Sequence, residues 1–80
     1  MDIKVRINNI EKYYNDKIKL LVNIYKYRYQ RILRSRLHNF YKRRYLLSIR
    51  SYFGDKIQTL KKMLSDAIQK IKHEYEQQQQ

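Results

Sequence analysis

The sequence predicts an all-α protein in which a long helix is followed by a shorter antiparallel helix, so that the two form an αα-hairpin. Three observations lead to this fold class. The 80 residues contain no proline and one glycine, Gly54, so little in the chain interrupts a helix. Apolar residues recur at steps of three and four positions, which is the helical period. One short segment, "SYFGDKIQ" at residues 51–58, combines the signals that end one helix and begin another.

The first helix is expected to run from about residue 2 to about residue 52. Its apolar stripe repeats every eleven residues, close to the period of a straight α-helix. The stripe contains Ile3, Ile7, Ile10, Tyr14, Ile18, Leu21, Tyr25, Tyr29 and Ile32, and it continues through Leu33, Leu37, Phe40 and Leu47. Asn15-Asp16 is the one place where this helix could break, because Asn can end a helix and Asp can cap the next. A continuous helix and a break at this site both remain open.

The second helix is expected to begin just after Gly54. Glycine suits the left-handed position that ends many helices, and Asp55 suits the N-cap of the next one. Gln58 stands three residues after Asp55, as in a capping box. One face of this helix would carry Ile57, Leu60, Leu64, Ile68, Ile71 and Tyr75. Residues 1–76 would thus form a single helical domain or a fragment of one, and the Gln-rich residues 77–80 would form a frayed tail.

The unequal helix lengths predict an interface with a partner. A short second helix would leave the first part of the stripe uncovered, and an exposed apolar stripe of that length indicates a docking surface. The uncovered residues would be Ile3, Ile7, Ile10, Tyr14 and Ile18. The expected partners are helical protein subunits, either other proteins or further copies of this chain.

Basic residues dominate the charge. The chain has 19 Lys and Arg against 7 Asp and Glu, for a net charge of +12, and no carboxylate lies between Lys17 and Gly54. Such a block attracts phosphates, acidic protein surfaces or anionic lipids. On a helical wheel, the outer face of this block contains Tyr27, Arg31, Arg34, Lys42 and Tyr45. This face is the candidate nucleic-acid-binding site, and a merely solvated basic face is the other interpretation.

Arg36 and Arg43 are expected in the middle of the apolar stripe, in line with Tyr25 and Tyr29. An arginine buried without a partner is very costly. Each arginine therefore either pairs with a carboxylate or phosphate across an interface, or extends its long stem out of the groove to reach water. The first alternative adds both arginines to the partner interface.

Nothing in the sequence indicates an enzyme or a cofactor. The chain has no glycine-rich phosphate loop and no nucleophile with a neighbouring base. It has no cysteine, and His38 and His73 are far apart, so no metal site is expected. No apolar run approaches the roughly 18 residues that span a bilayer. An intracellular protein is the expectation, and a membrane partner is not.

The segment "IYKYRYQRILRSRLHNFYKRRYLLSI", residues 24–49, resembles the long helix of the GINS subunits, especially the Sld-type subunit. The matching positions are Ile32, Leu33, Arg34, Arg36, Leu37 and Lys42, and Tyr27 stands where that helix carries an aromatic residue. His38-Asn39-Phe40 departs from the family's Lys-Ile-Glu, and nothing here matches the family's small β-rich domain. The resemblance implies a nuclear, non-catalytic helical subunit of a four-chain assembly that activates the replicative helicase.

Two other functions remain open. A stand-alone basic module would bind RNA or DNA without sequence preference through the Tyr27–Tyr45 face. An amphipathic helix lying on an anionic membrane is the weaker alternative, because the sequence shows no lipidation site to support it.

Overall fold

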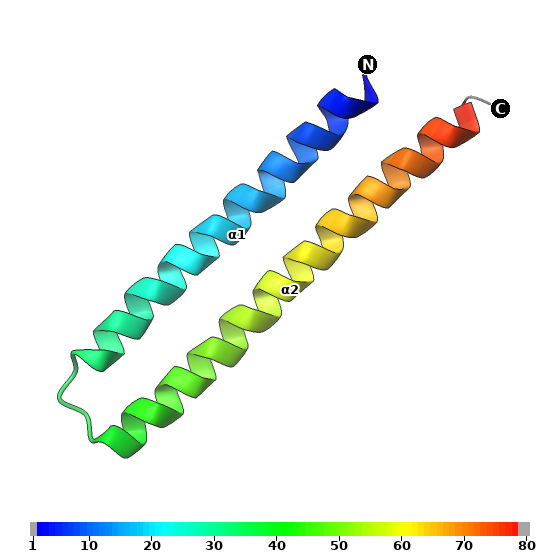
Figure 1. Ribbon diagram of the computed structural model, residues 1–80. Coiled ribbons are helices and arrows are strands. Elements are labelled where there is room, and N and C mark those ends of the chain that lie inside the picture. The colour runs from blue at the N-terminus through cyan, green and yellow to red at the C-terminus, as the bar shows by residue number, and fades with distance from the viewer. Residues whose placement is uncertain (1, 79–80) are drawn as a thin grey trace.

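The computed structural model describes residues 2–78, which form two long helices joined by one turn. Helix α1 spans Ile3–Leu33 and helix α2 spans Asn39–Gln78. The helices lie side by side and antiparallel, with both termini at the same end (Figure 1). The Cα atoms extend over 64 × 16 × 7 Å, so the molecule is a single flat layer of two helices. The predicted all-α hairpin is confirmed.

The turn lies at residues 34–38, so the prediction of a bend at Gly54 is wrong. Gly54 lies inside α2 and does not have a positive φ. Because the turn comes earlier than expected, α1 has 31 residues and α2, with 40, is the longer helix. Helix α1 also continues through Asn15-Asp16 without a break. Helix α2 includes Gln77, whose side chain lies 3.1 Å from a ring nitrogen of His73, while residues 79–80 of the predicted tail lie outside the described residues.

Side chains close the end of α1 without a glycine. Ser35 donates two hydrogen bonds to the carbonyl oxygen of Ile32, from its backbone N–H at 3.1 Å and from its hydroxyl at 2.7 Å. The Nζ of Lys42 reaches back from α2 and donates to the carbonyl oxygen of Leu33 at 3.1 Å. Carbonyls that the helix itself cannot satisfy are therefore bonded locally, and the Lys42 charge complements the negative end of the helix dipole.

The start of α2 is capped by His38. Its Nδ1 accepts a hydrogen bond from the backbone N–H of Phe40 at 3.2 Å, and its carbonyl oxygen accepts from the N–H of Lys42 at 3.0 Å. A side-chain acceptor at this position replaces the Ser, Thr or Asp that usually caps a helix. At the other end of the hairpin, Asp2 caps α1 in the usual way, since its Oδ1 accepts from the N–H of Lys4 at 3.1 Å.

The two apolar stripes face each other along the whole hairpin. The α1 stripe from Ile3 to Ile32 is half-buried against α2, so the expected overhang of its first part is absent. Ile3 borders the same small hollow as Ile71 near the chain ends. Only Phe53 and Ile71 are fully buried among the described residues, at 3% and 5% exposed. The core is therefore a single seam rather than a closed interior.

The position of the turn follows from this seam. A turn at Gly54 would pair a long helix with a short one and leave several apolar residues of α1 in water. A turn at residues 34–38 lets α2 cover the α1 stripe from end to end, and each apolar side chain so covered contributes to stability. Tertiary burial thus outweighs the local capping signal at Gly54-Asp55, which remains inside the helix.

Candidate nucleic-acid interface

The fold concentrates positive charge at the turn end of the hairpin. We call residues 20–57 the turn half, and residues 2–19 and 58–78 the terminal half. The turn half holds ten Lys and Arg and one carboxylate, Asp55, for a net charge of +9. The terminal half holds nine Lys and Arg and the other six carboxylates, for a net charge of +3. Positive charge is therefore distributed unevenly along the hairpin, and most of it lies in the turn half.

A basic groove runs between the helices in the turn half. Its volume is about 620 Å³, and both helices contribute to its walls. The residues that line it are Tyr25, Lys26, Tyr29, Gln30 and Leu33 from α1, and Asn39, Lys42, Arg43, Leu46, Leu47 and Arg50 from α2. Four of these side chains are cationic and none is a carboxylate. We refer to this feature as the basic groove.

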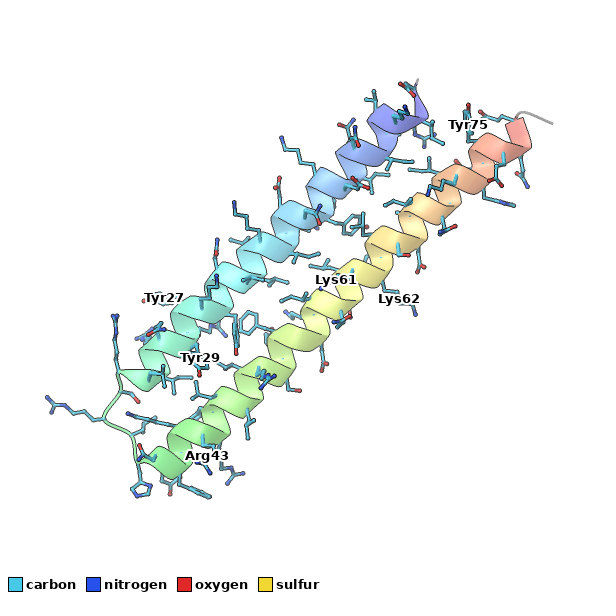
Figure 2. The ribbon with its side chains drawn as sticks, viewed as in Figure 1. Tyr27, Tyr29, Arg43, Lys61, Lys62 and Tyr75 are labelled. Atoms are coloured by element: carbon cyan, nitrogen blue, oxygen red, sulfur yellow. The ribbon has the colours of Figure 1, made fainter. Side chains whose placement is uncertain are left out.

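The floor of the basic groove is held in place by aromatic packing. The ring of Tyr25 lies 5.8 Å from the ring of the buried Phe53 and 5.9 Å from the ring of Tyr29. Arg28 also packs over Phe53, with its guanidinium carbon 5.4 Å from the ring centroid. Tyr25 and Tyr29 are therefore half-buried packing residues, as the sequence predicted, and Figure 2 shows Tyr29 between the helices.

The cations of the basic groove differ in how they are held. Lys42 is half-buried and already donates to the carbonyl oxygen of Leu33. Lys26, Arg43 and Arg50 are exposed, and no described residue forms a hydrogen bond or ion pair with their side chains. Three cations from two helices thus converge on one groove without an anion to neutralise them. A group with several negative oxygens would complement this arrangement.

The sequence-predicted site is divided by the turn. Tyr27 is 66% exposed and points away from α2 on the outer side of α1, as Figure 2 shows, and Arg31 is likewise exposed on α1. Arg34 caps the end of α1. Lys42 and Tyr45 belong to α2, where Tyr45 is exposed. These five residues therefore do not form one continuous helical face, although all of them lie in the turn half.

Arg36 and Arg43 do not occupy the apolar stripe, because the turn changes the helical register between them. Arg36 is exposed in the turn, so it needs no buried partner. Arg43 is exposed near the start of α2, where Figure 2 labels it, and it lines the basic groove. Sequence reasoning missed Lys26 and Arg50 as groove residues. A correctly placed turn would have revealed them, since the spacing of seven between Arg43 and Arg50 puts both on one side of α2.

The described residues contain no group of three or more His, Cys, Asp or Glu that could hold a metal ion. Neither helix, as far as it is described, is apolar over a long enough stretch to cross a membrane.

No family model, curated protein or solved structure matches this chain. The resemblance to GINS subunits therefore stays a prediction. The residues that carry most of it, 32–37, cross the end of α1 and the turn instead of lying within one long helix.

Proposed function

We propose that this chain is a non-catalytic, nucleic-acid-binding helical hairpin that holds a phosphate backbone in the basic groove. The observation that carries the proposal is the convergence of Lys26, Arg43 and Arg50 on a groove without a carboxylate. Cations with no internal partner do not contribute to folding, and their mutual repulsion opposes it. Bound phosphates would relieve that repulsion.

The charge gradient along the hairpin supports a polyanion over a single small anion. Cations continue beyond the basic groove to the turn, where Arg34 and Arg36 are exposed. A nucleic-acid backbone presents phosphates at regular intervals and could contact both the groove and the turn. Each neutralised phosphate releases a condensed counterion, which supplies affinity at low salt.

We expect little sequence preference. Lysine and arginine contacts to phosphates position a nucleic acid without reading its bases. Exposed tyrosines near the turn, such as Tyr27 and Tyr41, could stack on unpaired bases, and such stacking tolerates every base. Single-stranded nucleic acid would therefore gain a contact that a closed duplex does not offer.

The test is a salt titration of binding by the whole chain, with a short DNA duplex and a single strand as separate ligands. The groove variant replaces Lys26, Arg43 and Arg50 with Gln. If all three contact phosphate, the slope of log binding constant against log salt concentration should become less negative by about 2.7 on duplex DNA and about 2.1 on a single strand. The control variant carries Lys12→Gln, Lys62→Gln and Lys70→Gln. It removes the same charge from exposed sites in the terminal half.

The control should keep the wild-type slope, because those lysines lie outside the groove. Equal slopes for the groove variant and the control would reject the groove as the binding site. A third variant, Arg31→Gln with Arg34→Gln, tests the site that the sequence predicted. If only this variant changes the slope, the outer surface of the turn half binds phosphate and the basic groove does not.

A subunit of a helical assembly is the second candidate function. The observation that favours it is the imbalance between two fully buried apolar side chains and thirteen large apolar or aromatic side chains that are exposed among the described residues. Under the GINS resemblance, the covering partners would be other helical subunits in a nuclear complex. The mass of the purified chain, alone and mixed with the candidate subunits, tests this function.

A further inference from the structure

The side of the hairpin opposite the basic groove carries many of the large exposed apolar side chains, together with Arg28 and Arg31. At about 100° per residue, helical spacing puts Lys26 and Leu33 on one side of α1, and Leu20 and Ile24 on the other. The apolar side consists of Tyr13, Leu20 and Ile24 from α1 with Tyr45, Ile49, Tyr52 and Met63 from α2. We call this set the apolar face. Leu20 is 60% exposed, which makes it one of the most exposed aliphatic residues on the hairpin.

A shallow groove at mid-length shows that both helices contribute to this face. Its volume is about 510 Å³. The residues that line it are Lys17, Leu20, Leu21, Asp55, Lys56, Thr59 and Leu60. Leu20 and Thr59 thus border one groove from opposite helices, at the same level along the hairpin.

The two lysines at this groove lie against tyrosine rings of the apolar face. The Nζ of Lys17 lies 4.4 Å from the ring centroid of Tyr13, and the Nζ of Lys56 lies 4.5 Å from that of Tyr52. Each lysine therefore lays its stem along the surface of its own helix, four residues beyond its tyrosine. Long stems held in this way cover apolar surface and can extend their charges to the rim of an interface.

We propose that the apolar face binds a second copy of this chain, so that two hairpins form an antiparallel four-helix bundle. Helical domains normally consist of two layers around one core, and this hairpin supplies a single layer. A second copy provides a layer of the same length and chemistry. The inference concerns a different face from the basic groove and does not depend on nucleic-acid binding.

The flat side of the hairpin that carries the apolar face is large enough for a stable dimer. The flat side of the hairpin measures 64 × 16 Å between Cα extremes, which is about 1,000 Å² for each copy. Two copies packed over the full length of this side would bury up to about 2,000 Å² in total, at the upper end of the range for specific, stable protein interfaces. The seam within one hairpin would then become part of a closed core.

The charge distribution selects the antiparallel arrangement. If the turns of two hairpins lay at the same end, the +9 turn halves would face each other. In the antiparallel arrangement, each turn half faces the partner's terminal half, which holds six of the seven carboxylates. Repulsion acts over roughly 10 Å at 0.1 M salt, so it would discriminate between the two arrangements.

The first experiment measures the mass of the intact chain by sedimentation equilibrium at about 0.1 M and about 1 M salt. We expect twice the chain mass of 10.1 kDa, and tighter association at the higher salt, where the Debye length falls to about 3 Å. A helical monomer at both salt concentrations would overturn the proposal. So would a chain that becomes helical only when a different protein is added.

A matched pair of variants locates the interface. Leu20→Glu places a charge on the apolar face and should weaken dimerisation about tenfold or more, because like charges would meet across the interface. Leu47→Glu is the control, since Leu47 is 59% exposed but lines the basic groove on the other side. It should leave dimerisation unchanged and weaken nucleic-acid binding. Equal dimerisation by the two variants would reject the apolar face as the interface, whichever way the binding assay turns out.

Cysteine cross-linking distinguishes the two arrangements. The sequence has no native cysteine, so only the introduced cysteines would react. Leu20 and Thr59 both lie near the middle of their helices. In the antiparallel bundle each helix crosses its own copy, so Leu20→Cys alone and Thr59→Cys alone should each cross-link with a short thiol-reactive reagent. With the turns at the same end, α1 would lie over the partner's α2. Only a mixture of the two variants would then cross-link, and that result would overturn the antiparallel arrangement.

Discussion

Replacing Gly54 with alanine distinguishes the observed turn from the one that the sequence predicts. In this structure Gly54 lies inside α2, is exposed, and does not have a positive φ. A Cβ built on it would have no atom within 4 Å outside its immediate helical surroundings. Glycine inside a helix costs about 0.5–1 kcal/mol relative to alanine. Gly54→Ala should therefore stabilise the protein by that amount.

The expected signal is an increase in Tm. A change of 1 kcal/mol shifts the Tm of a domain of this size by roughly 4–8 °C, so Gly54→Ala should raise it by about 2–8 °C. Thermal unfolding followed by circular dichroism at one fixed protein concentration measures this change. Ser51→Ala, one turn earlier on α2, is the control, because serine differs less from alanine in helix propensity and should give a smaller increase.

A lower Tm for Gly54→Ala would refute the reasoning. That result is expected if Gly54 ended a helix in the left-handed conformation, where a Cβ is strained. The sign of one measurement thus decides whether the chain turns at residues 34–38 or at Gly54.

The remaining predictions concern the core and the apolar face. Phe53→Ala should lower the free energy of unfolding by about 3–5 kcal/mol, a large part of the roughly 4–12 kcal/mol expected for a chain of 80 residues. Phe40→Ala, at a 58% exposed site, should change the same free energy, measured by urea unfolding, by less than about 0.5 kcal/mol. Equal losses would contradict the register of the seam. The hydrogen bond and the charge from Lys56 lower the pKa of Tyr52 below its ordinary value of 10.0, so Lys56→Gln should raise it, as an NMR titration that resolves the Tyr52 ring would show. The stability linked to ionised Tyr52 is present above the unfolded-state pKa and is lost as pH falls through the lower folded-state pKa. Near pH 7 this contribution should therefore be absent both from the wild-type protein and from Lys56→Gln.

The sequence predicts the helices well because their apolar period is nearly unbroken. The residues expected on the inner faces, from Ile3 to Ile32 and from Ile57 to Ile71, are half-buried or buried in the seam. Hydrophobic periodicity reports the preferred inward face of a helix, whichever helix covers it. Tyr75, which the same reasoning placed inside, is 42% exposed at the open end of the hairpin.

The position of the turn could not be read from the same pattern, because the apolar spacing continues across it through Leu33, Leu37 and Phe40. The caps of the real turn come from Ser35 and His38, whose roles depend on the backbone that they stabilise. Gly54-Asp55 offers a stronger local signal, but a turn there would leave half of the α1 stripe uncovered. Only a comparison of the total burial in the two arrangements selects the correct one.

The error in the turn explains why the candidate site changed. A single helix through residues 25–45 places Tyr27, Arg31 and Lys42 on one outer face, whereas the turn reverses the chain between Arg31 and Lys42. That reversal brings Arg43 and Arg50 next to Lys26 across the groove. The excess of positive charge in this region followed from the positions of the charged residues in the sequence. The convergence of particular cations required the pairing of the helices.

The hairpin is a layer 7 Å thick between Cα extremes, and the basic groove and the apolar face lie on its opposite sides. Because the two surfaces face in opposite directions, occupation of one does not obstruct the other. In the proposed dimer, both basic grooves would point outward from the bundle. Added salt should then act in opposite directions on the two associations, because it screens the repulsion between hairpins while it weakens phosphate contacts. A phosphate backbone in the grooves would itself neutralise part of the charge that opposes dimerisation. By thermodynamic linkage, a ligand that tightens the dimer must also bind the dimer more tightly than the monomer. Binding curves measured with Leu20→Glu should therefore show reduced affinity even though its basic groove is intact, and unchanged affinity would mean that the two faces act independently.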